Sequence, residues 1–255
     1  MAKLGKRKIK MIKKSKKSSQ NSGLTIVIPS FKEAERLPLF LSTLTKNMPN
    51  DISYIIVDDG SPIDDFNLLC ERVKPFLNPN VSLLRYDINR GKGGAIEFGL
   101  EHANTEYVGF LDADGSIPHY EVINLWEYTK SNLHLDLILS SRIKLLGKQI
   151  DRSIKRHISG RIFVTYLNYL FNVPVYDSQC GFKIFKLSLY NSIKSKIINK
   201  RWLWDTELLI LSYLNGFKCA EVAIDWKDVQ GSKINLISDA IKMAFGLWDF
   251  KKKIL

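Results

Sequence analysis

Short apolar runs alternate along the first half of the chain with segments in which apolar residues recur every three to four positions. The runs are typical of buried strands, and the intervening periodicity is typical of helices. The predicted strands are 24–28, 52–57, 81–86 and 107–111, and the predicted helices are 33–44, 64–77 and 94–103. This alternation predicts an α/β fold whose central sheet is mostly parallel, flanked by helices and joined by right-handed crossovers.

Two later helical patterns combine apolar and basic residues. The first is 158–175, which follows Arg152, Lys155 and Arg156, and the second is 237–248, which precedes three lysines at 251–253. Each pattern fits an ordinary core helix or an amphipathic helix in the headgroup region of a membrane. No run of 18 or more apolar residues occurs, so no membrane span is predicted.

Net charge is concentrated at one end of the chain. The formal charge is +12, and residues 1–22 hold nine Lys or Arg and no acid, which leaves about +3 for the rest. We therefore expect no nucleic-acid partner. The predicted organisation is a disordered basic tail (1–22), attracted to anionic lipid or simply solvated, one domain (23–234) and a C-terminal amphipathic helix (235–255). The lack of a signal peptide and three scattered cysteines favour a cytoplasmic protein with reduced thiols.

Carboxylates follow two of the predicted strands. Asp112 and Asp114 lie two positions apart after strand 107–111, so they can point to the same side and hold Mg²⁺ or Mn²⁺, although such a pair alone is more typical of a solvated turn. Asp58 and Asp59 follow strand 52–57 and could accept hydrogen bonds from a nucleobase or ribose, or cap a helix. Parallel strands would gather these acids at one crevice.

A glycine-rich segment, 89–94, occupies the predicted start of the helix 94–103. Its backbone N–H groups and its two cations would suit a phosphate, unless the segment is only a flexible polar loop. The fingerprints of dinucleotide-binding folds and of P-loop ATPases are absent, which argues against both classes.

Together these motifs resemble family 2 glycosyltransferases of the GT-A fold. The segments that carry the resemblance are 26–33, 57–61, 89–95 and 111–115. The later segments 140–142, 177–183, 201–208 and 231–233 resemble the polyprenyl-phosphate branch, most of all dolichyl-phosphate glucosyltransferases and next dolichyl-phosphate mannose synthases. The resemblance covers about 24–245. Trp204-Asp205-Thr206-Glu207 departs from the usual Phe-Asp-Val-Glu, which leaves the sugar open.

The resemblance implies a role for individual residues. The implied nucleotide-sugar site comprises Pro29, Ser30, Glu33, Asp58, Asp59, Lys92, Gly93, Asp112, Ala113, Asp114 and Lys233, with Asp112 and Asp114 holding the metal. The implied catalytic residues are Asp114, Asp177 and Arg142, and those for an acceptor phosphate are Arg142, Arg156 and Gln179.

Several of these positions have simpler interpretations. Asp177 could be a turn acid before a strand, and Glu207 fits helix capping as well as catalysis. Trp202, Trp204 and Trp226 are expected to pack rather than to stack on sugar, although one of them could do both.

The implied reaction is inverting, metal-dependent transfer of a hexose to a polyprenyl (dolichyl or undecaprenyl) phosphate. UDP-glucose is the favoured donor and GDP-mannose the next, and another cell-surface glycan is the alternative acceptor. The enzyme would be peripheral, at the cytoplasmic face of a membrane, and a membrane-protein partner or homo-oligomer stays open. Two other classes fit less well. A nucleotidyltransferase would need a Gly-rich, Arg-containing loop where 29–32 stands, and an inactive membrane-binding module would not need the acidic motifs.

Overall fold

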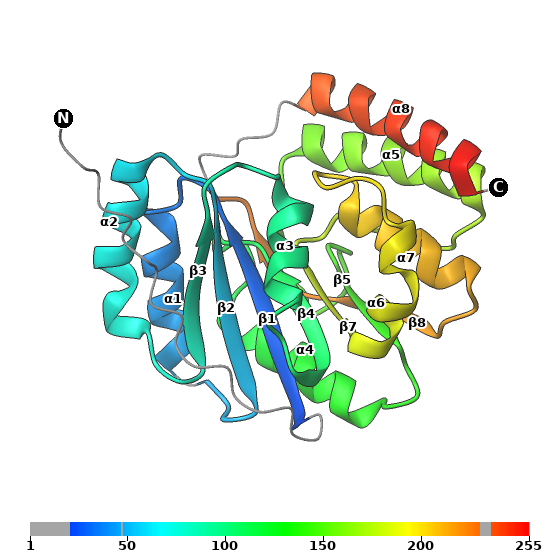
Figure 1. Cartoon of the computed structure of the whole chain (residues 1–255). Helices are drawn as coiled ribbons and strands as arrows, with labels where there is room; N and C mark the ends of the chain where they lie inside the picture. The colour runs from blue at the N-terminus through cyan, green and yellow to red at the C-terminus, as the bar shows by residue number, and fades with distance from the viewer. Residues whose placement is uncertain (1–20, 47, 230–235, 255) are drawn as a thin grey trace, which may run out of the picture.

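The computed structural model describes residues 21–46, 48–229 and 236–254 (Figure 1). The strands are β1 (Asn21–Ser30), β2 (Ile52–Asp59), β3 (Val81–Tyr86), β4 (Thr105–Leu111), β5 (Leu137–Ser141), β6 (Ile150–Asp151), β7 (Phe182–Lys186), β8 (Cys219–Ala223) and β9 (Trp226–Lys227). The helices are α1 (Arg36–Lys46), α2 (Ile63–Val73), α3 (Lys92–Leu100), α4 (His119–Ser131), α5 (Ile154–Phe171), α6 (Leu187–Ile193), α7 (Trp204–Leu214) and α8 (Leu236–Ile254), with short 3-10 turns η1 (Lys74–Phe76) and η2 (Lys194–Lys196). The predicted basic tail, apart from its last two residues, lies outside the described residues.

Seven strands form the central sheet in the order β3-β2-β1-β4-β7-β5-β8. β3, β2, β1 and β4 are parallel, as predicted, and β7 runs antiparallel between β4 and β5. Ser30 pairs in register with Asp58, and β4 ends one residue before Asp112. The predicted gathering of strand ends at one edge of the sheet is therefore confirmed.

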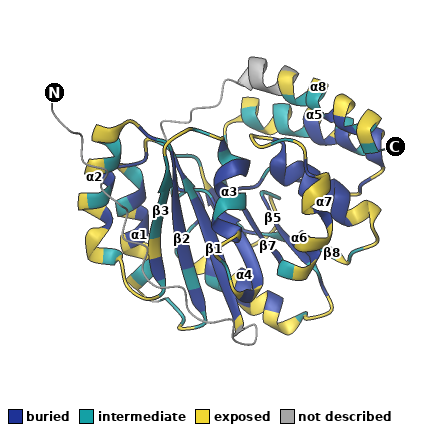
Figure 2. Cartoon of the chain, viewed as in Figure 1, coloured by how far each residue is buried: buried dark blue, intermediate teal, exposed yellow. Residues whose placement is uncertain are grey.

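The sheet separates two hydrophobic cores. Ile26 and Ile28 of β1 point into one core, which α1, α2 and α4 cover. Val27 points into the other, which α3, α6 and α7 cover. The strand period of two explains this division, because successive side chains point to opposite faces. Figure 2 shows the buried strands between helices whose outer surfaces are exposed.

α5 and α8 lie side by side beyond α7 (Figure 1), where the rings of Phe171 and Phe250 are 6.1 Å apart. α5 ends at Phe171, earlier than the predicted 175, because Asn172 adopts a left-handed conformation with φ 53°. The helix buries one face, yet Ile162 and Tyr169 of the predicted stripe are exposed. The buried face fits the core-helix interpretation, and the membrane interpretation of the exposed residues stays a prediction. None of the helices in the described ranges is long and apolar enough to cross a membrane.

Candidate active site

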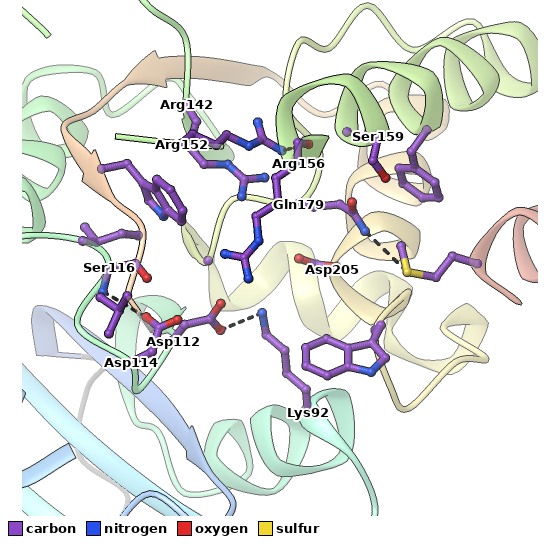
Figure 3. Close-up of a pocket in the computed structure, with 18 residues that line it drawn as sticks. Lys92, Asp112, Asp114, Ser116, Arg142, Arg152, Arg156, Ser159, Gln179 and Asp205 are labelled. Atoms are coloured by element: carbon purple, nitrogen blue, oxygen red, sulfur yellow. Dashed lines mark hydrogen bonds and ion pairs between the residues drawn. The ribbon is translucent and has the colours of Figure 1, made fainter. Parts of the chain in front are cut away.

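Two adjoining cavities open at the carboxyl edge of β1, β2 and β4. Lys92, Asp112, Asp114 and Trp202 line both of them. The second cavity adds the predicted residues Pro29, Ser30, Glu33, Asp59 and Ala113, together with Phe31, Arg36, Asn89, Gly91 and Arg201. The first cavity, drawn in Figure 3, adds the predicted Arg142, Arg156 and Gln179. The acidic pair therefore stands at the junction of the two cavities.

Asp112 and Asp114 extend from the end of β4. The Nζ of Lys92 lies 2.7 Å from Oδ1 of Asp112, and Oδ1 of Asp114 accepts the N–H of Ser116 at 2.9 Å. Burial raises the pKa of Asp112, Lys92 opposes this and Asp114 adds to it, so the net direction is upward. Burial lowers the pKa of Lys92, but Asp112, Asp205 and Asp114 outweigh burial and raise it. Together these charges favour the cationic form of Lys92.

The donor set at Asp112 and Asp114 fits a hard divalent cation. One oxygen of each carboxylate, Oδ2, has no hydrogen-bond or ion-pair partner in the described part of the chain. Gly181 leaves room for Asp112, since a Cβ there would collide with its carboxylate. Within the described ranges, no group of three or more His, Cys, Asp or Glu residues could hold a metal. An ion here would therefore take its other ligands from a bound phosphate and from water.

Asp58 and Asp59 hold the protein itself together at this edge. Asp58 is fully buried, pairs with Arg85 at 2.7 Å and lines neither cavity. Asp59 accepts hydrogen bonds from Tyr86, from the side chain of Asn89 and from the N–H groups of Arg90 and Gly91. In this structure Asp59 therefore fixes the glycine-rich loop, and its contact with a nucleotide remains a prediction.

The glycine-rich loop differs in part from the expected phosphate cradle. The N–H groups of Arg90 and Gly91 are bound to Asp59, and that of Gly94 donates to the carbonyl of Lys200 at 3.0 Å. The prediction that these groups face a phosphate is wrong for these three. Gly93 lines neither cavity, and a Cβ there would lie within 2.7 Å of three side-chain atoms of Trp204. Its role in the structure is close helix packing, whereas Lys92 lines both cavities and Asn89 and Gly91 line the second.

Asp177 holds Arg142 in place. Its carboxylate accepts from Arg142 Nε at 2.6 Å and Nη2 at 2.8 Å, and from the N–H groups of Arg142 and Gln179. Burial would raise the pKa of Asp177, but Arg142 outweighs burial and holds that pKa well below its usual range. Glu221 of β8 in turn accepts the N–H groups of Tyr176 and Asp177. Asp177 lines neither cavity, which fits the turn-acid interpretation, and its predicted place next to a sugar stays a prediction.

A cluster of three arginines closes one end of the first cavity, across from Asp112, Asp114 and Lys92 (Figure 3). Arg142 comes from the end of β5, and Arg152 and Arg156 come from the start of α5 and the residues before it. Arg156 forms an ion pair with Asp228. Gln179 lies nearby, and its Nε2 is 3.7 Å from Sδ of Met243 on α8. We call Arg142, Arg152 and Arg156 the arginine cluster.

Residues at the start of α7 and on the loop before it were only partly anticipated. Asp205 lines the first cavity and lies 3.1 Å from the fully buried ammonium of Lys183. Glu207 instead accepts the N–H groups of Ile198 and Asn199 and so anchors the loop before α7. Trp202 on that loop is 40% exposed and lines both cavities, so its predicted packing role is wrong. Trp204 is buried as predicted.

Neither Arg152 nor Asp205 was predicted to line the site, and the two differ in the sequence signal that could have indicated it. Arg152 carried only the signal of a basic residue before a helix, and Asp205 was visible within the motif 204–207. The predicted Lys233 lies outside the described residues.

Comparison with known proteins agrees with this architecture. Residues 25–203 match the family described as glycosyl transferase family 2. The chain is 32% identical to dolichyl-phosphate beta-glucosyltransferase of Saccharomyces cerevisiae, over 87% of this chain and 72% of the relative. It is 30% identical to the Homo sapiens protein of the same name, over 85% and 71%, and 29% identical to that of Dictyostelium discoideum, over 93% and 80%.

Among solved structures, glucosyl-3-phosphoglycerate synthase from Mycobacterium tuberculosis, in complex with Mn²⁺, UDP and glucosyl-3-phosphoglycerate, aligns with a TM-score of 0.70. It is 14% identical, and the alignment covers 92% of this chain and 81% of the other. This likeness confirms the predicted GT-A fold. With the match over 25–203 and relatives at 30% identity or more, it leads to one conclusion: the chain is an enzyme of glycosyl transferase family 2.

Proposed function

We propose that this enzyme transfers glucose from UDP-glucose to a polyprenyl phosphate of the dolichyl type, with inversion and with the help of Mg²⁺ or Mn²⁺. The observation that carries the proposal is the position of Asp112 and Asp114 between two cavities of different chemistry. One cavity lies at the strand ends, and the other combines arginines with apolar side chains. The names of the relatives in yeast and human support the same acceptor and sugar.

The second cavity is the proposed donor site. Its wall includes Ser30, whose buried hydroxyl has no partner within the described part of the chain, and Arg36, which forms two hydrogen bonds with Glu33. Asp112 and Asp114 would hold the divalent ion, which stabilises negative charge on a leaving diphosphate when bound. Lys92 stands beside the same carboxylates and would add a fixed positive charge where that diphosphate leaves.

The first cavity is the proposed acceptor site, because it is amphiphilic. The arginine cluster offers charged hydrogen-bond donors, whereas Ile117, Phe163 and Met243 give the cavity apolar walls. A lipid phosphate needs charged donors for its phosphate group and apolar walls for its hydrocarbon chain. Its oxygen is already anionic near neutral pH, so attack on the sugar requires no strong general base. This agrees with the geometry of Asp177, whose carboxylate is committed to Arg142.

We infer inversion from attack by an acceptor oxygen that enters from the first cavity and reaches the face of the sugar opposite the diphosphate held at Asp112 and Asp114. An α-linked donor would then give a β-linked product. Trp202, which lines both cavities, would border the sugar during transfer.

The outer surface of α5 and α8 is the proposed membrane contact. Exposed apolar residues on it are Ile154, Ile158, Ile162 and Tyr169 of α5 and Phe245 and Trp248 of α8. The last turn of α8 adds three lysines, which suit anionic headgroups. We place this contact at the cytoplasmic face, where a nucleotide sugar and a lipid phosphate could both reach the enzyme.

Transfer of radiolabel tests the proposal. Purified protein is incubated with MgCl₂ or MnCl₂, a short-chain polyprenyl phosphate and, in separate reactions, labelled UDP-glucose, GDP-mannose or UDP-N-acetylglucosamine, and label is followed into the organic phase. We expect transfer from UDP-glucose that EDTA and Asp114→Asn abolish. Asp64→Asn, which removes an exposed carboxylate on α2, is the matched control and should retain activity.

The other outcomes are equally informative. Label from GDP-mannose alone would keep the reaction and change the donor. Binding of UDP-glucose without transfer to any polyprenyl phosphate would refute the proposed acceptor, and full activity of Asp114→Asn would refute the proposed site.

A further inference from the structure

Arg152 differs from the other members of the arginine cluster in its partners. Arg142 is paired with Asp177, and Arg156 is paired with Asp228. No carboxylate of the described residues lies within ion-pair distance of Arg152, whose only hydrogen bond runs from Nη2 to the carbonyl of Arg156 at 2.9 Å. Arg152 is therefore the one arginine of the cluster without an ion-pair partner among the described residues.

The guanidinium of Arg152 is also incompletely hydrogen-bonded. Its Nε is buried and has no partner among the described residues. Burial lowers the pKa of Arg152 to about 10, and the nearby positive charge of Arg142 adds to this effect. A buried donor without an acceptor and a cation beside another cation are both costly, and a bound anion would relieve both costs.

Gly160 makes room for this guanidinium. A Cβ at Gly160 would lie 2.6 Å from Nη2 of Arg152, so the absence of a side chain lets Arg152 lie against α5 and face the cavity. Arg152 and Gly160 both line the first cavity, in which the arginine cluster gathers across from Asp112 (Figure 3). Any side chain at 160 would move the tip of a flexible arginine rather than backbone.

The position of Arg152 selects between the two phosphate-bearing substrates. None of the three arginines lines the second cavity, the proposed donor site. An anion held by Arg152 would therefore belong to the acceptor and not to the donor diphosphate. A phosphate monoester matches the requirement, because it offers three oxygens to several N–H donors and carries up to two negative charges.

We propose that Arg152 binds the phosphate group of the acceptor directly, and that Gly160 keeps the guanidinium of Arg152 in the binding position. The inference rests on the proposed function for the identity of the acceptor. Arg142 and Arg156, each already paired with a carboxylate, then orient the phosphate, and Arg152 supplies a charge without an ion-pair partner among the described residues.

Steady-state kinetics test the inference. Arg152→Gln should raise the KM for a polyprenyl phosphate about tenfold to a hundredfold, as expected for loss of a charged hydrogen bond, and should leave the KM for the nucleotide sugar unchanged. Arg152→Lys should recover part of the loss. Lys144→Gln removes one charge from an exposed lysine near Arg142 and should behave as wild type. An unchanged acceptor KM in Arg152→Gln, or a raised donor KM, would overturn the proposal.

Gly160→Ala distinguishes displacement of Arg152 from a loss of folding. Alanine in place of glycine favours a helix by about 1 kcal/mol, so the variant should be as stable as wild type or more so. It should nevertheless raise the acceptor KM, because its Cβ displaces Arg152. A stable Gly160→Ala variant with wild-type acceptor KM would contradict the inference.

Calorimetric binding of citronellyl phosphate, with citronellol as the uncharged control, separates this inference from the proposed function. We expect wild type to bind the phosphate and not the alcohol, and Arg152→Gln to bind it at least tenfold more weakly. If wild type shows this binding but transfers no sugar, the proposed function fails and the phosphate site stands. If wild type transfers sugar while both proteins bind the phosphate equally, the function stands and the role of Arg152 fails. Absence of phosphate binding by wild type would also overturn the role of Arg152.

Discussion

Replacement of Asp177 by Asn separates a positioning role from a catalytic base. Asp177 is 5% exposed, and its two oxygens accept two side-chain hydrogen bonds from Arg142. Asn has nearly the same shape but presents an NH₂ group to a guanidinium that is itself a donor. The change therefore leaves a largely buried charge without its partner, which typically costs about 3–5 kcal/mol. We expect the free energy of unfolding at pH 7, measured in urea, to fall by about this amount.

The stability difference between wild type and Asp177→Asn should depend on pH. Arg142 holds the pKa of Asp177 below its unfolded value, which is about 3.9. The native state therefore binds a proton more weakly than the unfolded chain, and the stabilisation is complete above the unfolded pKa and lost as the pH falls toward the folded pKa. The stability difference between wild type and Asp177→Asn should be largest near neutrality and shrink below about pH 4.

Activity should follow the position of Arg142. The acceptor KM should rise in Asp177→Asn while binding of the nucleotide sugar, measured by calorimetry, stays as in wild type. The pH profile of kcat near neutral pH should be the same for wild type and Asp177→Asn, because Asp177 does not titrate there. A variant with wild-type stability whose kcat alone collapses would refute this reasoning and assign Asp177 to proton transfer.

Three further predictions follow from other parts of the structure. Gly93→Ala should lower the free energy of unfolding by about 1–3 kcal/mol, because its Cβ would overlap Trp204, and urea titration would show no change if that contact were loose. Burial raises the pKa of Glu207 despite its two backbone N–H partners, so protonation of Glu207 stabilises the fold. This contribution to the free energy of unfolding is lost as the pH rises from about 4 through the folded pKa. Urea titrations from pH 4 to 8 should show this decrease in wild type and not in Glu207→Gln. The double variant Phe245→Ser, Trp248→Ser should weaken co-sedimentation with anionic phospholipid vesicles at least about tenfold, and equal binding would exclude α8 from the membrane contact.

The strands before Asp112 could be predicted because their signal is local. Residues 81–86 coincide with β3, and β2 needed only two more residues, Asp58 and Asp59. The reversed direction of β7 could not be predicted in this way, because a buried strand has the same apolar composition whether its neighbours run parallel or antiparallel. That direction depends on distant contacts of the chain.

In the candidate site too, features set by local sequence could be predicted and features set by distant contacts could not. Asp112 and Asp114 could be placed at the crevice from strand order alone. The partners of a buried carboxylate could not, and so the ion pair of Asp58 with Arg85 was not anticipated. Arg152 was expected only as a basic residue before a helix, because its lack of a carboxylate partner, on which its proposed role rests, shows only in three-dimensional contacts.

The reversal of β7 has a consequence for how such an enzyme could be re-engineered. β5 ends at Ser141 and β7 begins at Phe182, on neighbouring strands of the sheet, so the stretch 142–181 leaves and re-enters the scaffold at adjacent points. That single stretch contains the whole arginine cluster and Gln179, although the first cavity, like the second, also draws on other segments of the chain. The arginines of the proposed acceptor site thus lie on one continuous segment, which could be exchanged between relatives without cutting β1, β2 and β4.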